Sequence, residues 1–410
     1  MKILYNAKDH PSISSGYGII TRYLTPLLGR RYGKKRIFLH CPVYQKGSQS
    51  EYEGMVVLPG GKFDFDEDVC LMHYQEIGAD MLIMVGDVWP ICQSVIPKAA
   101  AEDKIYWIQW CAFDFLPPFP DYVLEGLRHC HKIVPFSKWG ETLLREQGFT
   151  NVTQAIWPGL NTELWKPYSR DAFPKTAKSL GFEPDAYNIL ICAANQGRKY
   201  YPEHFEGIRI FREKHPEVKL RLYVHSQPRA DRDLLADFNY FKLGDITRLP
   251  DEYTLMCGNY SEWDMVRVFA SADVCLSAAL EGFGYATVQA QAVGVPVIAL
   301  NYGVSQELVH SGTLVPVKDW DMQMGNLKKV VPSEEGIAKA LEEIWMRGPD
   351  RTRWAKGAQW IQENLSWEKI AQEWYRVIDE CAAEKMKGCV TIPEPSPLLD
   401  RKAQKVMQFG

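Results

Sequence analysis

The chain has 410 residues, 46% of them hydrophobic and 24% charged, and its formal net charge is −4. This length exceeds one ordinary core and predicts two domains of roughly 200 residues each. The weak negative charge excludes a global attraction to nucleic acid or membrane, and no uninterrupted apolar stretch has the length that spans a bilayer.

The N-terminal residues MKILYNAKDHPSISSG lose their apolar character after Tyr5. They are therefore typical of a first strand rather than of a signal peptide. The ten cysteines are scattered and form no C-x-x-C pair. We expect buried thiols in a reducing compartment, and a cytoplasmic protein without stable membrane insertion.

The first half of the chain alternates strand-like and helix-like segments. In chain order these are KILYNA, GIITRYLTPLLGRR, IFLHCPVY, MLIMVG, KIYWIQW, PDYVLEGLRHC, HKIVPFS, KWGETLLREQG and VTQAIWPG. Such alternation is typical of a parallel sheet covered by helices. The stretch WPGLNTELWKPYSRDAFPK, with three prolines, then predicts a domain boundary near residues 165 to 186.

The strand and helix patterns resume after this boundary, and helix patterns dominate the C-terminus. In chain order the segments are YNILICAANQ, HFEGIRIFREKH, KLRLYVHS, ADRDLLADF, SEWDMVRVFASA, SADVCLSAA, VPVIAL, SEEGIAKALEEIWMRG, DRTRWAKGAQWIQENL and SWEKIAQEWYRVIDECAAEKM. Residues 386–410 are expected to form an irregular tail. The sequence predicts an α/β protein of two doubly wound domains, with ligands bound outside the carboxyl ends of the strands.

The loop between SADVCLSAA and the next helix predicts an anion site. Gly282 and Gly284 let the backbone turn tightly, and the helix from about Tyr285 to Val293 points its first N–H groups back at the loop. The expected phosphate donors are first-turn amides and one hydroxyl, at Tyr285, Ala286 and Thr287. Glu281 is either a helix cap or part of this site, and the converging N–H groups favour the site. Phe283 is expected to pack.

EGFG followed by a helix and GVPVIA resembles the donor-site signature of the retaining glycosyltransferases of the GT-B fold, family four (glycosyl transferases group 1). Further matching stretches are SGYGIITRYL, VPFSKWGETLLREQG, IWPGLNTELWKP, AANQGRKYYPEHF and LSWEKIAQEW, so the resemblance spans about residues 1–380. It implies two doubly wound Rossmann-like domains facing across a cleft. By the same resemblance, residues 1–170, with a returning helix near 366–385, are expected to form the acceptor side, and residues 186–365 to bind the nucleotide-sugar donor.

The resemblance implies transfer of a sugar from a UDP-, GDP- or ADP-sugar to an acceptor hydroxyl, with retention at the anomeric carbon. Negative charge grows on the leaving diphosphate, so the chemistry requires cations or helix dipoles there. Arg198 and Lys199, in ANQGRKYY directly after a predicted strand, are the expected clamp, and Asn195 is expected to help bind the donor. The alternative is a solvated loop pair. The family commonly has an arginine five positions before its lysine, where this chain has Ala194, and Arg198 is the candidate to replace it.

The family pattern also places two glutamates eight positions apart, the first at the sugar and the second on the ribose. Glu281 occupies the first position, whereas the second is Gln289. An amide oxygen can still accept a hydrogen bond from a ribose hydroxyl, although a carboxylate bond is roughly twice as strong. Two alternatives therefore stay open: a catalytically weak nucleotide-sugar-binding protein, and a GT-B epimerase or phosphorylase.

Gly16, Tyr17 and Gly18 open the first predicted helix. Taken alone, GYGIIT resembles a degraded dinucleotide fingerprint. It sits about nine residues past the strand end, however, and no acid ends IFLHCPVY, which argues against NAD. The resemblance implies instead that this loop reaches the phosphates of the donor.

The aromatic segment YWIQWCAFDFLPPFP holds another candidate. The resemblance implies a histidine or aspartate beside the reacting sugar, and Asp114 is the match. Asp87 in GDVWP also follows a predicted strand and is a second candidate; a capping or solvated aspartate is the alternative for both. Trp107 and Trp110 are expected in the core.

The segment KFDFDEDV contains Asp64, Asp66 and Asp68, and a D-x-D pair holds a divalent metal in the other large glycosyltransferase fold. DRD at 231–233 shows how readily such a pair arises in a chain with 51 acidic residues. We expect a solvated loop at 64–68 and no required metal or cofactor. The acceptor stays open: a glycan, a lipid carrier, a small molecule, a protein or a modified nucleobase.

Overall fold

The structure is a computed structural model that describes all residues except 44–45, 63–65, 259, 324 and 388–410. The chain divides into two compact units. Unit 1 comprises Met1–Phe113, Pro117–Gly159 and Trp367–Gly410, and unit 2 comprises Asp114–Leu116 and Leu160–Ser366. Within the described ranges, no helix is both long and apolar enough to cross a membrane.

Unit 1 is built on a seven-stranded sheet with the order β3-β4-β2-β1-β5-β6-β7. Its strands are β1 Ile3–Ala7, β2 Ile37–His40, β3 Ser50–Tyr52, β4 Met55–Leu58, β5 Met81–Val85, β6 Trp107–Cys111 and β7 Lys132–Pro135. All neighbours pair in parallel except the edge strand β3. The central strands β1, β5 and β6 are buried along their whole length, as expected where helices cover both faces of a parallel sheet.

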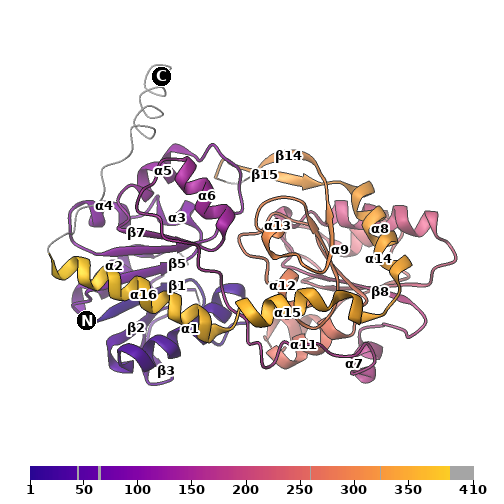
Figure 1. The fold of residues 1–410 in the computed structure, drawn as a ribbon, viewed down its shortest axis with the longest axis horizontal. Helices are drawn as coiled ribbons and strands as arrows, with labels where there is room; N and C mark the ends of the chain where they lie inside the picture. Colours follow the sequence, from indigo (N-terminus) through magenta and orange to yellow (C-terminus); the bar gives the residue numbers. More distant parts are fainter. Residues whose placement is uncertain (44–45, 63–65, 259, 324, 388–410) are drawn as a thin grey trace, which may run out of the picture. The chain divides into compact units, whose positions relative to one another are not determined.

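The helices of unit 1 include α16, which returns from the end of the described chain. They are α1 Gly16–Tyr32, η1 Lys34–Arg36, α2 Glu67–Glu76, α3 Val88–Ile91, α4 Ile96–Ala101, α5 Asp121–Leu127, α6 Lys138–Glu146 and α16 Trp367–Met386. Figure 1 shows α16, in yellow, beside α1. Tyr23 stacks on Trp367 with ring centroids 5.8 Å apart, and the Tyr375 hydroxyl donates to the Leu27 carbonyl at 3.0 Å.

Unit 2 is built on a six-stranded parallel sheet with the order β10-β9-β8-β11-β12-β13. Its strands are β8 Tyr187–Cys192, β9 Leu220–His225, β10 Thr247–Arg248, β11 Val274–Ser277, β12 Val297–Leu300 and β13 Gly312–Val315. Its helices are α7 Pro174–Ser179, η2 Gly197–Lys199, α8 Tyr201–Lys214, α9 Leu234–Tyr240, α10 Glu252–Met256, α11 Glu262–Ala270, α12 Tyr285–Ala292, α13 Ser305–Leu308, α14 Glu334–Arg347, η3 Arg351–Trp354 and α15 Ala355–Asn364.

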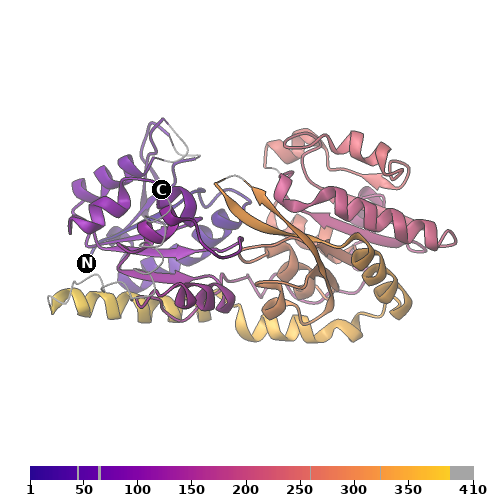
Figure 2. The same ribbon diagram turned by 90° about the horizontal axis from the view of Figure 1, so that it is seen from above.

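A two-stranded antiparallel hairpin, β14 Val317–Gln323 and β15 Leu327–Pro332, lies outside this sheet. Figure 2 shows it in orange as a long twisted ribbon. The Leu116 amide donates to the Lys328 carbonyl at 2.7 Å, so the short segment Asp114–Leu116 pairs with β15. This hairpin was not predicted from the sequence. The segment VTQAIWPG was predicted to be a regular element, but it forms only an isolated bridge, between Val152 and Ile133.

The core of unit 1 contains the tryptophans expected there. Trp107 and Trp110 are fully buried, which confirms that prediction. The Trp110 indole donates to the Ile156 carbonyl at 2.9 Å and packs edge-on against Trp374. Among the nine described cysteines, seven are buried and behave as small core residues.

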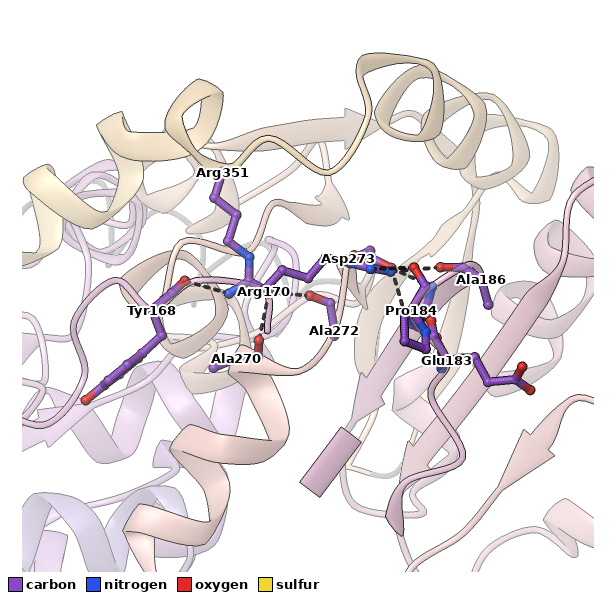
Figure 3. Close-up of polar contacts among 10 residues, drawn as sticks. Tyr168, Arg170, Glu183, Pro184, Ala186, Ala270, Ala272, Asp273 and Arg351 are labelled. Atoms are coloured by element: carbon purple, nitrogen blue, oxygen red, sulfur yellow. Dashed lines mark hydrogen bonds and ion pairs between the residues drawn. The ribbon is translucent and has the colours of Figure 1, made fainter. Parts of the chain in front are cut away.

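Two arginines tie the segment after Leu160 to the sheet of unit 2 (Figure 3). The Arg170 guanidinium donates to both oxygens of Asp273 at 2.5 and 2.9 Å. Asp273 also accepts from the backbone and side-chain amides of Asn188 at 2.9 and 3.0 Å. Arg351 donates to three backbone carbonyls at 2.7–2.8 Å, those of Tyr168, Ala270 and Ala272. Burial lowers the pKa of Arg351 to about 10.

Candidate functional site

Two loops of unit 2 meet because their strands are neighbours. β8 and β11 pair in parallel, so their carboxyl ends lie at the same edge of the sheet. The chain runs outward from β8 to β9 on one side and from β11 to β12 on the other, which makes this the point where strand order reverses. The loop after β8 carries Arg198 and Lys199, and the loop after β11 carries Glu281.

These side chains form one ion-pair cluster. The Lys199 ammonium contacts Oε1 of Glu281, while Arg198 Nη1 lies 3.4 Å from Glu281 Oε2. The same Arg198 nitrogen lies 3.6 Å from Oδ2 of Asp114, which reaches the cluster through the segment that pairs with β15. The structure thus brings together the four residues that the sequence singled out for catalysis.

Burial and charge set the protonation of the cluster. Lys199 is only 8% exposed. Burial lowers the pKa of its ammonium to about 8, with Arg198 adding to this and Glu281 opposing it. Burial alone would raise the pKa of Glu281, but Lys199 and Arg198 outweigh it and hold that pKa at about 2. At neutral pH the pair is therefore ionic.

Lys329 of β15 is a further member that the sequence reading missed. Its ammonium lies 2.7 Å from Asp114 Oδ2, and the residue is 4% exposed. The cluster is then a row of alternating charges, Lys199, Glu281, Arg198, Asp114 and Lys329, with three cations to two carboxylates. One positive charge remains in excess, which favours an anionic ligand. Lys329 occupies a buried position of β15, which the residues LKKVVP do not by themselves indicate.

Tyr200 links the hairpin to the loop that carries the cations. Its hydroxyl donates to Asp321 Oδ1 at 2.8 Å and accepts from Gln323 Nε2 at 3.4 Å. Its backbone is left-handed, with φ 50° and ψ 45°, a conformation that costs on the order of 1 kcal/mol or more for a residue other than glycine. Because Tyr200 follows Lys199 directly, the hairpin contacts hold this turn, and with it the direction of the lysine.

The start of α12 has the form expected of an anion site, with one correction. Gly284 precedes the helix in the left-handed region at φ 86°, and no side chain caps this fully described N-terminus. The Thr287 amide, however, donates to the Gly284 carbonyl at 3.0 Å, and the Thr287 hydroxyl to Ser277 Oγ at 3.5 Å. Thr287 therefore serves the turn itself, and half-buried Tyr285 and Ala286 are the first-turn residues that face outward.

Four further residues of unit 2 were predicted to bind the donor, and their surroundings differ. Gly282 is buried, and Phe283 is 5% exposed and packs on the Tyr285 ring, as expected. Gln289 is 8% exposed on α12. Both amide hydrogens of Asn195 are used within the fold, on the carbonyls of Gln227 and Arg232 at 3.1 and 2.8 Å. Asn195 thus stabilises the loop, and its side-chain amide has no N–H group left to donate to a ligand.

The GYG segment lies in unit 1. The Tyr17 hydroxyl donates to Asp87 Oδ1 at 2.9 Å, so these two candidates meet each other. Gly16 is exposed at the start of α1, whereas Gly18 is buried, and a Cβ at position 18 would lie 2.1 Å from the Ile13 carbonyl. A side chain at position 18 would therefore clash with the backbone that precedes α1.

The prediction of a solvated loop at residues 64–68 is wrong for Asp66. Asp64 lies outside the described residues, and Asp68 is exposed on α2. Asp66 is not solvated: it is 3% exposed and precedes α2, and its Oδ2 accepts from the Gly61 amide. Across the described ranges, no group of three or more histidine, cysteine or acidic side chains is placed to hold a metal ion.

The ammonium of Lys199 predicts an alkaline limit to any activity that needs its charge. With a pKa of about 8, the charge is present below pH 8 and is lost as the pH rises above it. We expect kcat/KM for an anionic substrate to fall above about pH 8, because this ratio reports the free protein. The alkaline fall in kcat should occur at higher pH than the fall in kcat/KM, because a bound anion stabilises the protonated form of Lys199. A profile flat to pH 9.5 would contradict this assignment.

Residues 194–340 match the family described as glycosyl transferases group 1. A D-inositol 3-phosphate glycosyltransferase of Saccharomonospora viridis is 25% identical over 248 residues, which cover 57% of this chain and 51% of that protein. The enzyme of that name from Paenarthrobacter aurescens is 24% identical over 220 residues, 52% of this chain and 48% of that protein. The chain thus matches about half the length of these curated relatives.

Solved structures match over most of the chain. Anabaena Alr3699/HepE, in complex with UDP and glucose, has a TM-score of 0.67 at 14% identity, over 93% of this chain and 100% of that chain. The catalytic domain of starch synthase IV from Arabidopsis thaliana, bound to ADP and acarbose, has a TM-score of 0.63 at 14% identity, over 93% and 99% of the two chains. At these identities the likeness shows the fold, which is GT-B.

Proposed function

We infer that this chain is a group 1 glycosyltransferase of the GT-B fold that moves a sugar from a nucleotide diphosphate to an acceptor hydroxyl with retention at the anomeric carbon. One observation carries the proposal. The cations Arg198, Lys199 and Lys329, which lie within the family-matched residues, pair with Glu281 and Asp114 beside the strand-order reversal of unit 2. That is where an open α/β sheet binds its ligand.

The cations stabilise the leaving group. As the bond between the anomeric carbon and the diphosphate oxygen breaks, negative charge grows on the diphosphate. Arg198, Lys199 and Lys329 lie where they oppose that charge, and the N-terminus of α12 adds its dipole. Removing any of these charges therefore raises the barrier to bond cleavage.

The proton of the acceptor needs a base, and the leaving diphosphate oxygen itself serves. The acceptor hydroxyl oxygen forms its bond to the anomeric carbon on the face that the diphosphate leaves, and its proton passes to the diphosphate oxygen. Glu281, ionised with a pKa of about 2, is a poor base for this transfer. Its role is to hold Lys199 and Arg198 and to accept hydrogen bonds from sugar hydroxyls.

A screen of nucleotide sugars identifies the nucleobase and the sugar of the donor. UDP-, GDP- and ADP-sugars are added to the protein and thermal stabilisation and release of nucleoside diphosphate are recorded. One nucleotide class should stabilise the protein, and its sugar should be released slowly to water without an acceptor and faster with one. Saturable binding without release over hours would instead support the binding-protein alternative that Gln289 keeps open.

Lys329 and Lys328 provide a matched pair in β15. Lys329 points into the cluster, whereas half-exposed Lys328 places its ammonium 4.0 Å from the centre of the Trp320 ring. Replacing Lys329 by methionine should lower kcat/KM for the donor about 10- to 100-fold, because one charge-assisted contact to the diphosphate is lost. Lys328→Met should stay within about twofold of the unchanged protein. Equal effects of both substitutions would show that Lys329 does not bind the diphosphate.

A further inference from the structure

One cross-strand pair of the β14–β15 hairpin contacts the charge cluster at two points. The strands pair antiparallel, and Asp321 of β14 lies directly opposite Lys329 of β15. Directly opposite residues of an antiparallel pair point to the same face of the sheet. Asp321 and Lys329 therefore share one face of the hairpin, from which Asp321 contacts Tyr200 and Lys329 contacts Asp114.

Asp321 is connected to Lys199 through Tyr200, which is 4% exposed. The Tyr200 hydroxyl donates to Asp321 Oδ1 at 2.8 Å, while Gln323 Nε2 donates to Asp321 Oδ2 at 3.1 Å. Burial raises the pKa of Tyr200, so the hydroxyl keeps its proton and can donate. Lys199 ends η2, and the Tyr200 amide closes that turn on the Gly197 carbonyl at 3.2 Å. The bound hydroxyl thus fixes the end of the turn from which Lys199 extends.

The backbone of Tyr200 indicates that the turn depends on this contact. Its φ of 50° lies in the left-handed region, which glycine adopts freely and other residues adopt at an energetic cost. Such a conformation persists where the surrounding structure fixes it, and it is frequent at functional sites. The hydrogen bond to Asp321 is a contact of this kind. Loss of the hydroxyl should therefore let the turn relax and move Lys199.

Lys329 fixes the neighbouring cation in a similar way. Its ammonium lies 2.7 Å from Asp114 Oδ2, and Arg198 Nη1 lies 3.6 Å from the same oxygen. Asp114 thus bridges Lys329 and Arg198. The two adjacent cations of the loop after β8, Arg198 and Lys199, are both connected to the Asp321–Lys329 pair.

We propose that Asp321 is a positioning residue for the transfer reaction, which holds Lys199 in place through the Tyr200 hydroxyl. Its opposite partner Lys329 holds the second cation through Asp114, so one pair of the hairpin places both cations at the diphosphate. This inference rests on the proposed function. A carboxylate near an anion site repels the anion, so a role through charge alone would make Asp321 unfavourable for the reaction. Positioning predicts the opposite sign.

Substitutions of Asp321 separate positioning from charge. Asp321→Ala should lower kcat about 10-fold, because a small displacement of a catalytic group has a large effect on the rate. Asp321→Asn removes the same charge but keeps an acceptor oxygen for Tyr200, and its kcat should stay within about threefold of the unchanged protein. A kcat in Asp321→Ala that is unchanged or higher would overturn the inference.

The matched control is Asp319→Ala, two positions earlier on the same strand. Asp319 is exposed, and its Oδ1 accepts from the amide of the next residue, Trp320, at 2.7 Å. Its replacement removes one carboxylate from β14, as Asp321→Ala does, and should leave kcat within about twofold of the unchanged protein. An equal fall of kcat in both variants would show that damage to the hairpin, and not the contact to Tyr200, lowers the rate.

The pKa of Lys199 gives a readout that does not require turnover. The charged and titratable groups that act on its ammonium are Glu281, Arg198, Asp114, His204 and Cys192. Tyr200→Phe keeps all of them and removes only the hydroxyl. If the turn then relaxes, water reaches the ammonium, and its pKa should rise from about 8 to about 9 or more.

NMR of the full chain with ¹⁵N-labelled lysine measures this pKa, and Lys199→Ala assigns the signal. A pKa that stays near 8 in both Tyr200→Phe and Asp321→Ala would overturn the inference even where kcat falls, since a smaller folded fraction lowers the rate without moving a pKa. If the pKa stays near 8 while the unchanged protein turns over a nucleotide sugar, the inference alone fails. If no nucleotide sugar is bound or turned over, the proposed function fails.

Discussion

Replacing Lys199 by alanine is expected to lower kcat with the nucleotide-sugar donor by about 100-fold or more, the cost typical of removing one group that stabilises transition-state charge. The ammonium contacts Glu281 and is nearly buried, so its charge acts through little water. Steady-state kinetics with the donor from the screen give kcat and KM. The drop should be larger in kcat than in the affinity for free nucleoside diphosphate, because the charge on the diphosphate grows only as the bond breaks.

Two controls separate chemistry from folding. Lys339→Ala changes a lysine of α14 that is exposed, and its kcat should remain within about twofold of the unchanged protein. Circular dichroism and thermal unfolding report whether Lys199→Ala keeps its fold, since the change leaves Glu281 with Arg198 as its remaining ion-pair partner in the cluster. A folded Lys199→Ala variant with unchanged kcat would show that Lys199 does not stabilise the leaving diphosphate.

Replacing Asp273 by alanine should destabilise unit 2 by about 1–3 kcal/mol, because Arg170 and Asn188 lose the acceptor that they share, although the carbonyls of Pro184, Ala186 and Glu183 still accept from them. Asp273 accepts four hydrogen bonds, two from Arg170 and two from Asn188, and its side chain is 9% exposed. Urea unfolding followed by tryptophan fluorescence measures the loss. A second transition at lower denaturant would mark unit 2 as the part that unfolds first.

The matched control for this change is Asp237→Ala on α9. Asp237 also forms a paired contact with an arginine, Arg232, at 2.8 and 2.9 Å, but that guanidinium is about one-third exposed. Surface ion pairs contribute about 0–1 kcal/mol, so the loss should be correspondingly small. Equal losses in the two variants would show that burial of the Arg170 pair adds nothing to the stability of unit 2.

The sequence predicted most strands and helices because their periodicities are strong. β5 is a continuous apolar run, β1 and β6 are apolar except at Asn6 and Gln109, and α12 begins at Tyr285, after the two glycines, where it was expected. The cluster of Arg198, Lys199 and Glu281 was also predictable, since adjacent parallel strands bring their following loops together. Local patterns and one topological rule were sufficient for these parts.

The β14–β15 hairpin and Lys329 could not be predicted in the same way. The segment VKDWDMQMGNLKKVVP has exposed residues along most of β14, so its alternation carries no clear signal of a buried face. Lys329 is buried, and its ammonium donates to Asp114, 215 positions away in the chain. A pairing over that separation leaves no trace in composition or spacing, and the same holds for Tyr17 with Asp87 and for the burial of Asp66.

The central claim is that a diphosphate binds beside Lys199 at the N-terminus of α12, and the most direct test is a crystal structure with the nucleoside diphosphate that the screen selects. We expect a β-phosphate oxygen within hydrogen-bond distance of Lys199 Nζ and of the Ala286 amide. A diphosphate bound elsewhere, with Lys199 still paired to Glu281 alone, would contradict it.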